Sequence, residues 1–119
     1  MNRLEHKKVK RTRRKAHIRK RVVGTAERPR LTVYRSLRYV YVQAIDDAQG
    51  KTLAAASNRE KDLRQIKSTV AGGGELGQVI GRRLKEKNIA KVVFDRNGFA
   101  YHGVVKAIAD GARKAGVEF

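Results

Sequence analysis

The chain has 119 residues, which gives room for one compact domain and a tail but not for a second hydrophobic core. Its 29 Lys and Arg residues against 11 Asp and Glu residues give a formal charge of +18, an excess that calls for a polyanionic partner such as nucleic acid. The absence of cysteine excludes a disulfide framework and a thiolate metal site, and no apolar run approaches the roughly 18 residues of a membrane span, so we expect a cytoplasmic protein.

The positive charge is concentrated at the start of the chain. Residues 1–30 hold 13 basic and 2 acidic side chains, while residues 31–119 hold 16 and 9. Between Arg3 and Arg21 the sizeable apolar residues are few, so this segment cannot bury enough surface to fold alone. We predict a basic arm over residues 1–27 that is disordered when free and becomes helical on RNA, where phosphates remove the repulsion between its cations.

The globular domain is predicted over residues 28–119, because Pro29 ends any helix that runs in from the arm. Residues 31–36 and 39–45 alternate with a period of two and are rich in β-branched and aromatic side chains. This pattern predicts a hairpin that turns at Leu37 and Arg38 and pairs Arg35 with Val40.

Paired residues share a face of the hairpin, so the predicted register separates its two faces. One face is apolar and should carry helices; it consists of Leu31, Val33, Val40, Val42 and Ala44. The other face is the candidate contact surface; it consists of Thr32, Tyr34, Ser36, Tyr39, Tyr41 and Gln43.

The remaining elements follow in chain order. Residues 46–50 have turn chemistry, with Asp46 and Asp47 interpreted as solvated turn residues, and residues 51–57 form a third strand. Capping-box spacing from Ser57 to Glu60 predicts a short helix that the glycines at 72–74 interrupt, and a second helix follows over residues 75–87.

A fourth strand is predicted at residues 90–94, a turn at 95–98 and a last helix at 101–115, with Gly116 as its stop. The fold class is therefore an α/β (α+β) sandwich, in which a three-strand antiparallel meander and one parallel strand carry helices on one face.

No motif indicates catalysis or a cofactor. The glycines at 72–77 match the spacing of a dinucleotide-binding loop, but no buried strand precedes them, so a flexible helix break is the interpretation. Residues 31–36 contain no acid for a metal-dependent nuclease, and His6, His17 and His102 lack metal-ligand spacing. We expect no enzyme activity, no metal, no cofactor and no small-molecule substrate.

The tyrosines of the hairpin allow two interpretations. Cross-strand tyrosine pairs stabilise sheets, and phenol rings also stack on unpaired bases. Arg35 and Arg38 alternate with Tyr34, Tyr39 and Tyr41, so cations could hold phosphates beside a stacking surface.

Several segments together resemble the bacterial form of the L18 family of large-subunit ribosomal proteins, and the resemblance covers the whole chain. They are residues 30–36, 41–43, 94–98, 101–103 and 106–113, together with the ending Ala115, Gly116 and Val117. Leu37 and Val104 depart from the family, which commonly has a polar residue and an arginine there.

The resemblance implies a ribonuclease-H-like topology without that enzyme's acids. It also implies a ribosomal protein that binds 5S rRNA and helps to attach it to 23S rRNA in the central protuberance, beside neighbouring 5S-binding ribosomal proteins. The charge alone would also permit a nucleoid-type DNA-binding protein. From the charge pattern and the resemblance, the candidate RNA-binding residues are Lys7, Lys8, Lys10, Arg11, Arg13, Arg14, Lys15, Arg19, Lys20, Arg21, Arg30, Arg35, Ser36, Arg38, Tyr39, Gln43, Arg96, Tyr101 and His102.

Overall fold

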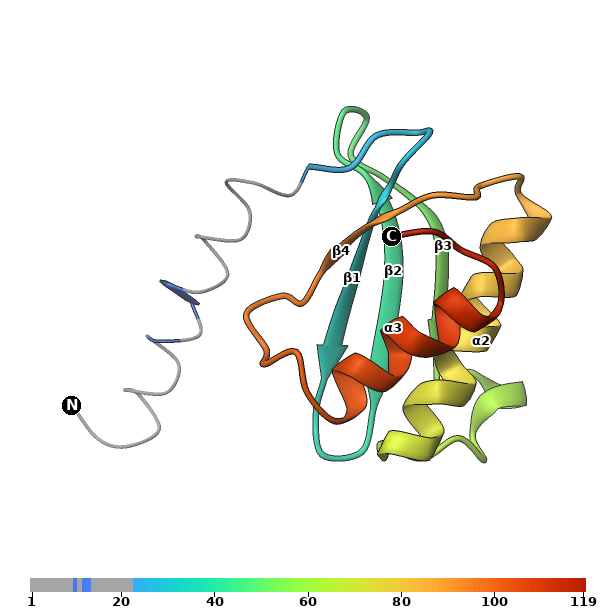
Figure 1. Cartoon of the computed structure of the whole chain (residues 1–119). Coiled ribbons are helices and arrows are strands. Elements are labelled where there is room, and N and C mark those ends of the chain that lie inside the picture. Colours follow the sequence, from blue (N-terminus) through green and yellow to red (C-terminus); the bar gives the residue numbers. More distant parts are fainter. Residues whose placement is uncertain (1–9, 11, 14–22) are drawn as a thin grey trace.

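The computed structural model describes Lys10, Thr12, Arg13 and residues 23–119. Within this part a four-stranded sheet has the order β3-β2-β1-β4 (Figure 1). Its strands are β1 (Arg30–Arg35), β2 (Val40–Asp46), β3 (Lys51–Ser57) and β4 (Val93–Asp95). The first three strands pair antiparallel and β4 runs parallel to β1, so the predicted α/β fold class is confirmed.

The hairpin forms in the predicted register. Arg35 is opposite Val40, and the pairing continues to Leu31 opposite Ala44. The predicted apolar face is buried in every member, whereas Tyr34, Tyr39 and Gln43 of the other face are exposed. A period of two therefore sorted the side chains correctly between core and surface.

Two helices cover one face of the sheet, α2 (Val70–Glu86) and α3 (Val104–Lys114), as Figure 1 shows. Leu76, Ile80 and Leu84 of α2 are fully buried, as is Ile108 of α3. These side chains form one core with the apolar face of the hairpin, so the opposite face is left for another use.

The prediction for residues 57–74 is wrong in part. Half of the capping box forms: the Glu60 carboxylate accepts a hydrogen bond from the Ser57 backbone N–H at 2.9 Å, but the Ser57 hydroxyl accepts from the Arg59 N–H instead of from that of Glu60. Only one 3-10 turn, η1 (Lys61–Leu63), follows it, and the chain is then extended at the N-cap Thr69. The glycines at 72–74 lie within the first turns of α2 and do not interrupt a helix.

These glycines are required by close packing. A Cβ atom on Gly73 would lie 2.9 Å from the Val104 carbonyl oxygen, and one on Gly77 would lie 2.2 Å from that of Ile108. A Cβ atom on Gly111 would in turn lie 2.3 Å from the Gly74 carbonyl oxygen. The glycines therefore let the backbones of α2 and α3 approach each other more closely than alanine would allow.

Candidate nucleic-acid interface

Aromatic contacts hold the polar face of the hairpin in place, both within the face and with the turn that follows β4. The Tyr34 ring lies 6.1 Å from the Tyr41 ring and 6.1 Å, edge to face, from the Phe99 ring. A shallow cavity of about 410 Å³ opens over this face, lined by Tyr34, Tyr41 and Gln43 among others. The face thus presents aromatic edges and amide groups of fixed geometry, which is the chemistry of a base-contacting surface.

The tip of the hairpin is a tight turn with an exposed cation. The Ser36 backbone N–H donates to the Tyr39 carbonyl oxygen at 2.8 Å, and the Tyr39 N–H donates to the Ser36 hydroxyl at 3.2 Å. Leu37 is 99% exposed and Arg38 is also exposed. The backbone bonds fix the turn, so Arg38 and Tyr39 are presented from a rigid support.

Sequence reasoning missed one cation of this surface, Arg59. It follows β3, and its guanidinium lies 5.0 Å from the centre of the Tyr39 ring and donates to the Tyr41 hydroxyl at 3.3 Å. The hydrogen bond to Tyr41 raises the pKa of Arg59, so the cation is held beside the two phenol rings. The pairing of Ser57 with Tyr41 across the sheet could have indicated this position.

The region around residues 96–102 lies next to the hairpin because β4 pairs with β1. The Asn97 side-chain amide donates to the Val33 carbonyl oxygen at 2.9 Å, which fixes the turn, and Arg96 donates to the Phe99 carbonyl oxygen at 3.2 Å. Tyr101 and His102 are exposed at its end. The structure therefore brings the turn that follows β4 next to the hairpin.

Arg30 is placed differently from the rest of the predicted set. Its guanidinium is buried and donates to Asp95 at 2.7 Å and to Asp47 at 3.0 and 3.1 Å. Burial would lower the pKa of Arg30, but the hydrogen bonds to Asp47 and Asp95 outweigh it and raise that pKa. Arg30 is thus buried and ion-paired within the fold, unlike the exposed Arg35 and Arg38 of the predicted set.

The interpretation of Asp46 and Asp47 as solvated turn residues is wrong for the same reason. Asp46 is buried and accepts a hydrogen bond from the Ala48 N–H at 3.0 Å. Asp47 joins Arg30 to Gly24, whose N–H donates to its carboxylate at 2.7 Å. The turn therefore contributes to the frame of the sheet.

Lys10 and Arg13 are the two predicted cations of the arm that the structure describes, and both are exposed. The other predicted arm residues, from Lys7 to Arg21, lie outside the described residues. Among the described residues no group of three or more His, Asp or Glu side chains is placed to hold a metal ion. Within the same part of the chain, no helix has the length and apolar character needed to cross a bilayer.

Comparisons with known proteins agree with this arrangement. Residues 5–119 match the family described as "Ribosomal L18 of archaea, bacteria, mitochondria and chloroplast". A relative from Treponema denticola, the large ribosomal subunit protein uL18, is 63% identical over 110 residues and 92% of each chain. Those from Treponema pallidum (59% identical; 95% of this chain, 94% of the relative) and Brachyspira hyodysenteriae (56% identical; 94% of each) carry the same name.

Proposed function

The chain belongs to the L18 family of ribosomal proteins, and from this membership we propose that it binds 5S rRNA and helps to attach it to 23S rRNA in the central protuberance. It is a structural protein of the large ribosomal subunit in the cytoplasm and not an enzyme. The finer assignment to 5S rRNA, and to contacts with neighbouring 5S-binding proteins, is the part that requires an experiment.

The observation that carries the proposal is the division of the sheet into a covered and an open face. Helices α2 and α3 cover the apolar face, whereas the opposite face presents Tyr34, Tyr41 and Gln43, with Arg38 at its tip. Sequence-specific RNA recognition uses unstacked bases that lie on aromatic rings and bond to polar side chains. A fixed aromatic and polar face beside exposed arginines supplies both kinds of contact.

The arm has a separate role in the proposal. Residues 1–27 bind phosphates with little dependence on sequence and become helical on the RNA, while the domain over residues 28–119 supplies shape recognition. Phosphate contacts release counterions, so the affinity should fall steeply with salt. If the arm makes about 6–10 such contacts, raising salt from roughly 50 to 200 mM costs on the order of 10³–10⁵ in affinity for a duplex target.

A filter-binding experiment tests the proposal. The full chain is titrated onto a 5S rRNA transcript at several salt concentrations, with a 23S rRNA fragment, transfer RNA and duplex DNA as competitors. Preferential retention of 5S rRNA with a steep salt dependence is the expected result. Equal competition by duplex DNA would favour a nucleoid-type protein, and a flat salt response would reject phosphate binding by the arm.

A further inference from the structure

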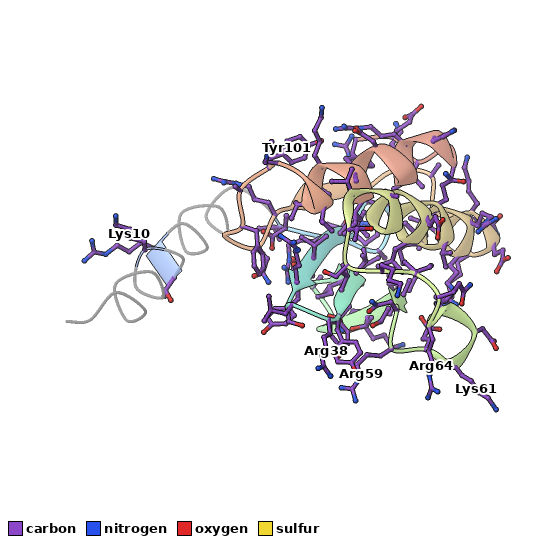
Figure 2. All side chains as sticks on the ribbon, turned by 90° about the horizontal axis from the view of Figure 1, so that it is seen from below. Lys10, Arg38, Arg59, Lys61, Arg64 and Tyr101 are labelled. Carbon is purple, nitrogen blue, oxygen red and sulfur yellow. The ribbon has the colours of Figure 1, made fainter. Side chains whose placement is uncertain are left out.

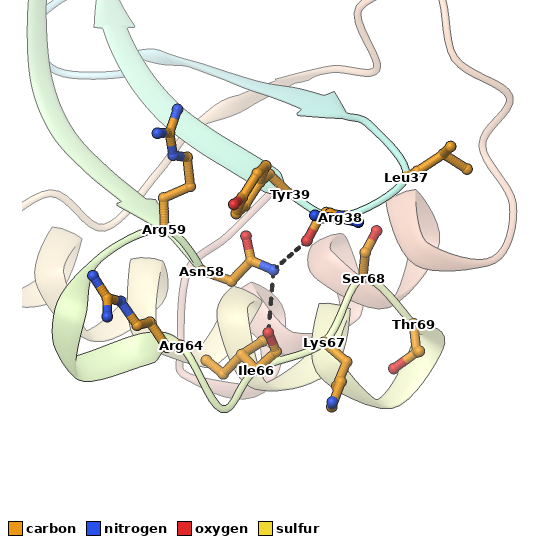
Figure 3. Close-up of a pocket in the computed structure, with 10 residues that line it drawn as sticks. All are labelled: Leu37, Arg38, Tyr39, Asn58, Arg59, Arg64, Ile66, Lys67, Ser68 and Thr69. Carbon is orange, nitrogen blue, oxygen red and sulfur yellow. Dashed lines mark hydrogen bonds between the residues drawn. The ribbon is translucent and has the colours of Figure 1, made fainter.

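A second cavity, of about 620 Å³, opens at the end of the sheet between the hairpin tip and the segment that links β3 to α2 (Figure 3). Residues 37–39 line one side of it and residues from 58 to 69 line the other. Its volume is within the range of about 300–1,000 Å³ that is usual for ligand sites. It is separate from the shallow cavity over the tyrosines, because the two cavities have no lining residue in common.

The lining of this cavity is strongly cationic. Four of its residues are exposed cations and none is acidic: Arg38, Arg59, Arg64 and Lys67. Glu60 lies next to Arg59 in sequence, but a hydrogen bond from Arg83 at 2.9 Å lowers its pKa and compensates its charge. The cavity therefore concentrates positive potential at one concave place, which favours an anionic ligand.

The cavity is built before any ligand arrives. The Asn58 side chain is 6% exposed; its amide donates to the Arg38 carbonyl oxygen at 2.9 Å and to the Ile66 carbonyl oxygen at 3.1 Å (dashed in Figure 3). Its Oδ1 accepts from the Val40 N–H at 2.9 Å. One buried amide thus joins the two walls, so binding does not have to order them.

We propose that this cavity is a second RNA-binding site, which takes the sugar–phosphate backbone of an unpaired segment of 5S rRNA. The inference rests on the proposed function and adds Arg59, Arg64 and Lys67 to the RNA-binding residues. Proteins that bind single strands combine a cationic groove with an aromatic surface, and here Tyr39 supplies the ring beside the four cations. An acidic protein segment would also be attracted, but the cavity adjoins the hairpin tip, so RNA that docks on the hairpin reaches it without a second partner.

The orientation of the side chains supports this placement. Figure 2 shows Arg38, Arg59 and Arg64 extending from the same side of the molecule, together with Lys61 of η1. Tyr101 lies on the other side in this view. The cavity cations and Tyr101 thus lie on different sides of the domain.

Charge replacement tests the site. The full-length triple variant Arg59→Gln, Arg64→Gln, Lys67→Gln is compared with a control triple of equal charge change on the outer sides of α2 and α3, Lys85→Gln, Lys106→Gln, Lys114→Gln. Each phosphate contact to a single strand contributes about 0.7 to the salt slope, so three contacts contribute about 2. Between roughly 50 and 200 mM salt, wild-type affinity for 5S rRNA should fall about 20-fold further than that of the cavity variant.

The control triple should keep the wild-type slope, and thermal unfolding should show both variants folded. Equal slopes for the cavity and control variants would overturn the site while leaving 5S rRNA binding by the wild type intact. Failure of the wild type to bind 5S rRNA would instead reject the proposed function. Unchanged RNA affinity with lost incorporation into large-subunit particles would assign the cavity to a protein partner, which also overturns the proposal.

Directed cleavage identifies the RNA segment. The chain has no cysteine, so Gln65→Cys introduces a single attachment point for an iron chelate beside Arg64, and Gln49→Cys provides a matched exposed control in the turn at the other end of β2. Hydroxyl radicals from position 65 should cut an unpaired segment of 5S rRNA that position 49 does not cut. Cleavage confined to duplex, or identical from both positions, would contradict the proposal.

Discussion

The close approach of α2 and α3 predicts opposite effects for the same substitution at two glycines. In Gly77→Ala the new Cβ atom would lie 2.2 Å from the Ile108 carbonyl oxygen, more than 1 Å inside the 3.4 Å at which ordinary contact begins. The oxygen is a backbone atom and the Cβ atom is bonded directly to the backbone, so neither can rotate away and the helices must separate. In Gly74→Ala the new Cβ atom meets nothing within 4 Å.

The magnitudes follow from two opposing effects. Alanine is favoured over glycine within a helix by about 1 kcal/mol, whereas forcing an extra carbon into a packed interface costs typically about 1–3 kcal/mol and sometimes more. Because the contact at Gly77 is with backbone, we expect a net loss of about 2 kcal/mol there. For Gly74→Ala we expect a gain of up to about 1 kcal/mol.

Thermal unfolding followed by circular dichroism measures both effects. For a domain of this size about 1 kcal/mol corresponds to roughly 4–8 °C, so Gly77→Ala should lower the Tm by about 8–16 °C and Gly74→Ala should raise it by a few degrees. Urea titration should give the same order of stability. If Gly77→Ala equals or exceeds the wild type, the glycines do not set the distance between the helices.

Four further predictions concern charge and recognition. Arg30→Met leaves the buried Asp95 and the partly buried Asp47 without their cation and should cost about 3–5 kcal/mol in urea unfolding. Deletion of residues 1–21 should greatly weaken 5S rRNA binding and flatten its salt dependence, while a cooperative thermal transition remains. Tyr39→Leu should cost about 1–3 kcal/mol in RNA binding if a base stacks there, and almost nothing if the ring only supports the sheet. The hydrogen bond from Arg83 lowers the pKa of Glu60, so this pair stabilises the fold above the ordinary glutamate pKa of about 4.3 and ceases to do so as the pH falls through the lowered pKa. The Glu60→Gln variant should therefore be less stable than the wild type by at most about 1 kcal/mol at neutral pH, because the pair is half-exposed, and equally stable in acid.

The pairing of residues in the hairpin could be predicted because it depends only on residues that are close together in the sequence. Alternation identifies the buried face, and a two-residue loop fixes which residue lies opposite which. That loop places Leu31 opposite Ala44, as the structure confirms. The parallel fourth strand followed from the same order of elements, since a crossover helix returns the chain to the edge next to β1.

The predicted start of α2 is wrong because glycines in a sequence can indicate either a break in a helix or a close contact between two helices. A run of three glycines usually weakens a helix, and that rule alone suggests a break at residues 72–74. In the structure Gly73, Gly77 and Gly81 recur every four residues and lie on the side of α2 that contacts α3. That spacing was visible in the sequence and indicates a helix–helix contact.

The role of Arg30 could not be read from local sequence at all. Its partner Asp95 is 65 residues away and its partner Asp47 is 17 residues away. Only the pairing of β1 with β4 and the turn after β2 bring the three together. The neighbouring basic arm suggests an RNA contact for Arg30, whereas the structure shows that its side chain pairs with two carboxylates.

The placement of the carboxylates explains how a chain of charge +18 keeps cations available for RNA. In the part of the chain that the structure describes, the ion pairs of Arg30 and Arg83 join different elements of the fold, and that of Arg113 lies within α3. The cations of the hairpin tip and its neighbouring cavity take part in none of these pairs. Acids spread evenly over the surface would lower the repulsion but would also compete with phosphate for the same guanidinium groups. Pairing Asp47, Asp95 and Glu60 with arginines of the frame stabilises the fold where these charges meet, and the repulsion among the cations of the hairpin tip and the cavity is left to be relieved by the RNA.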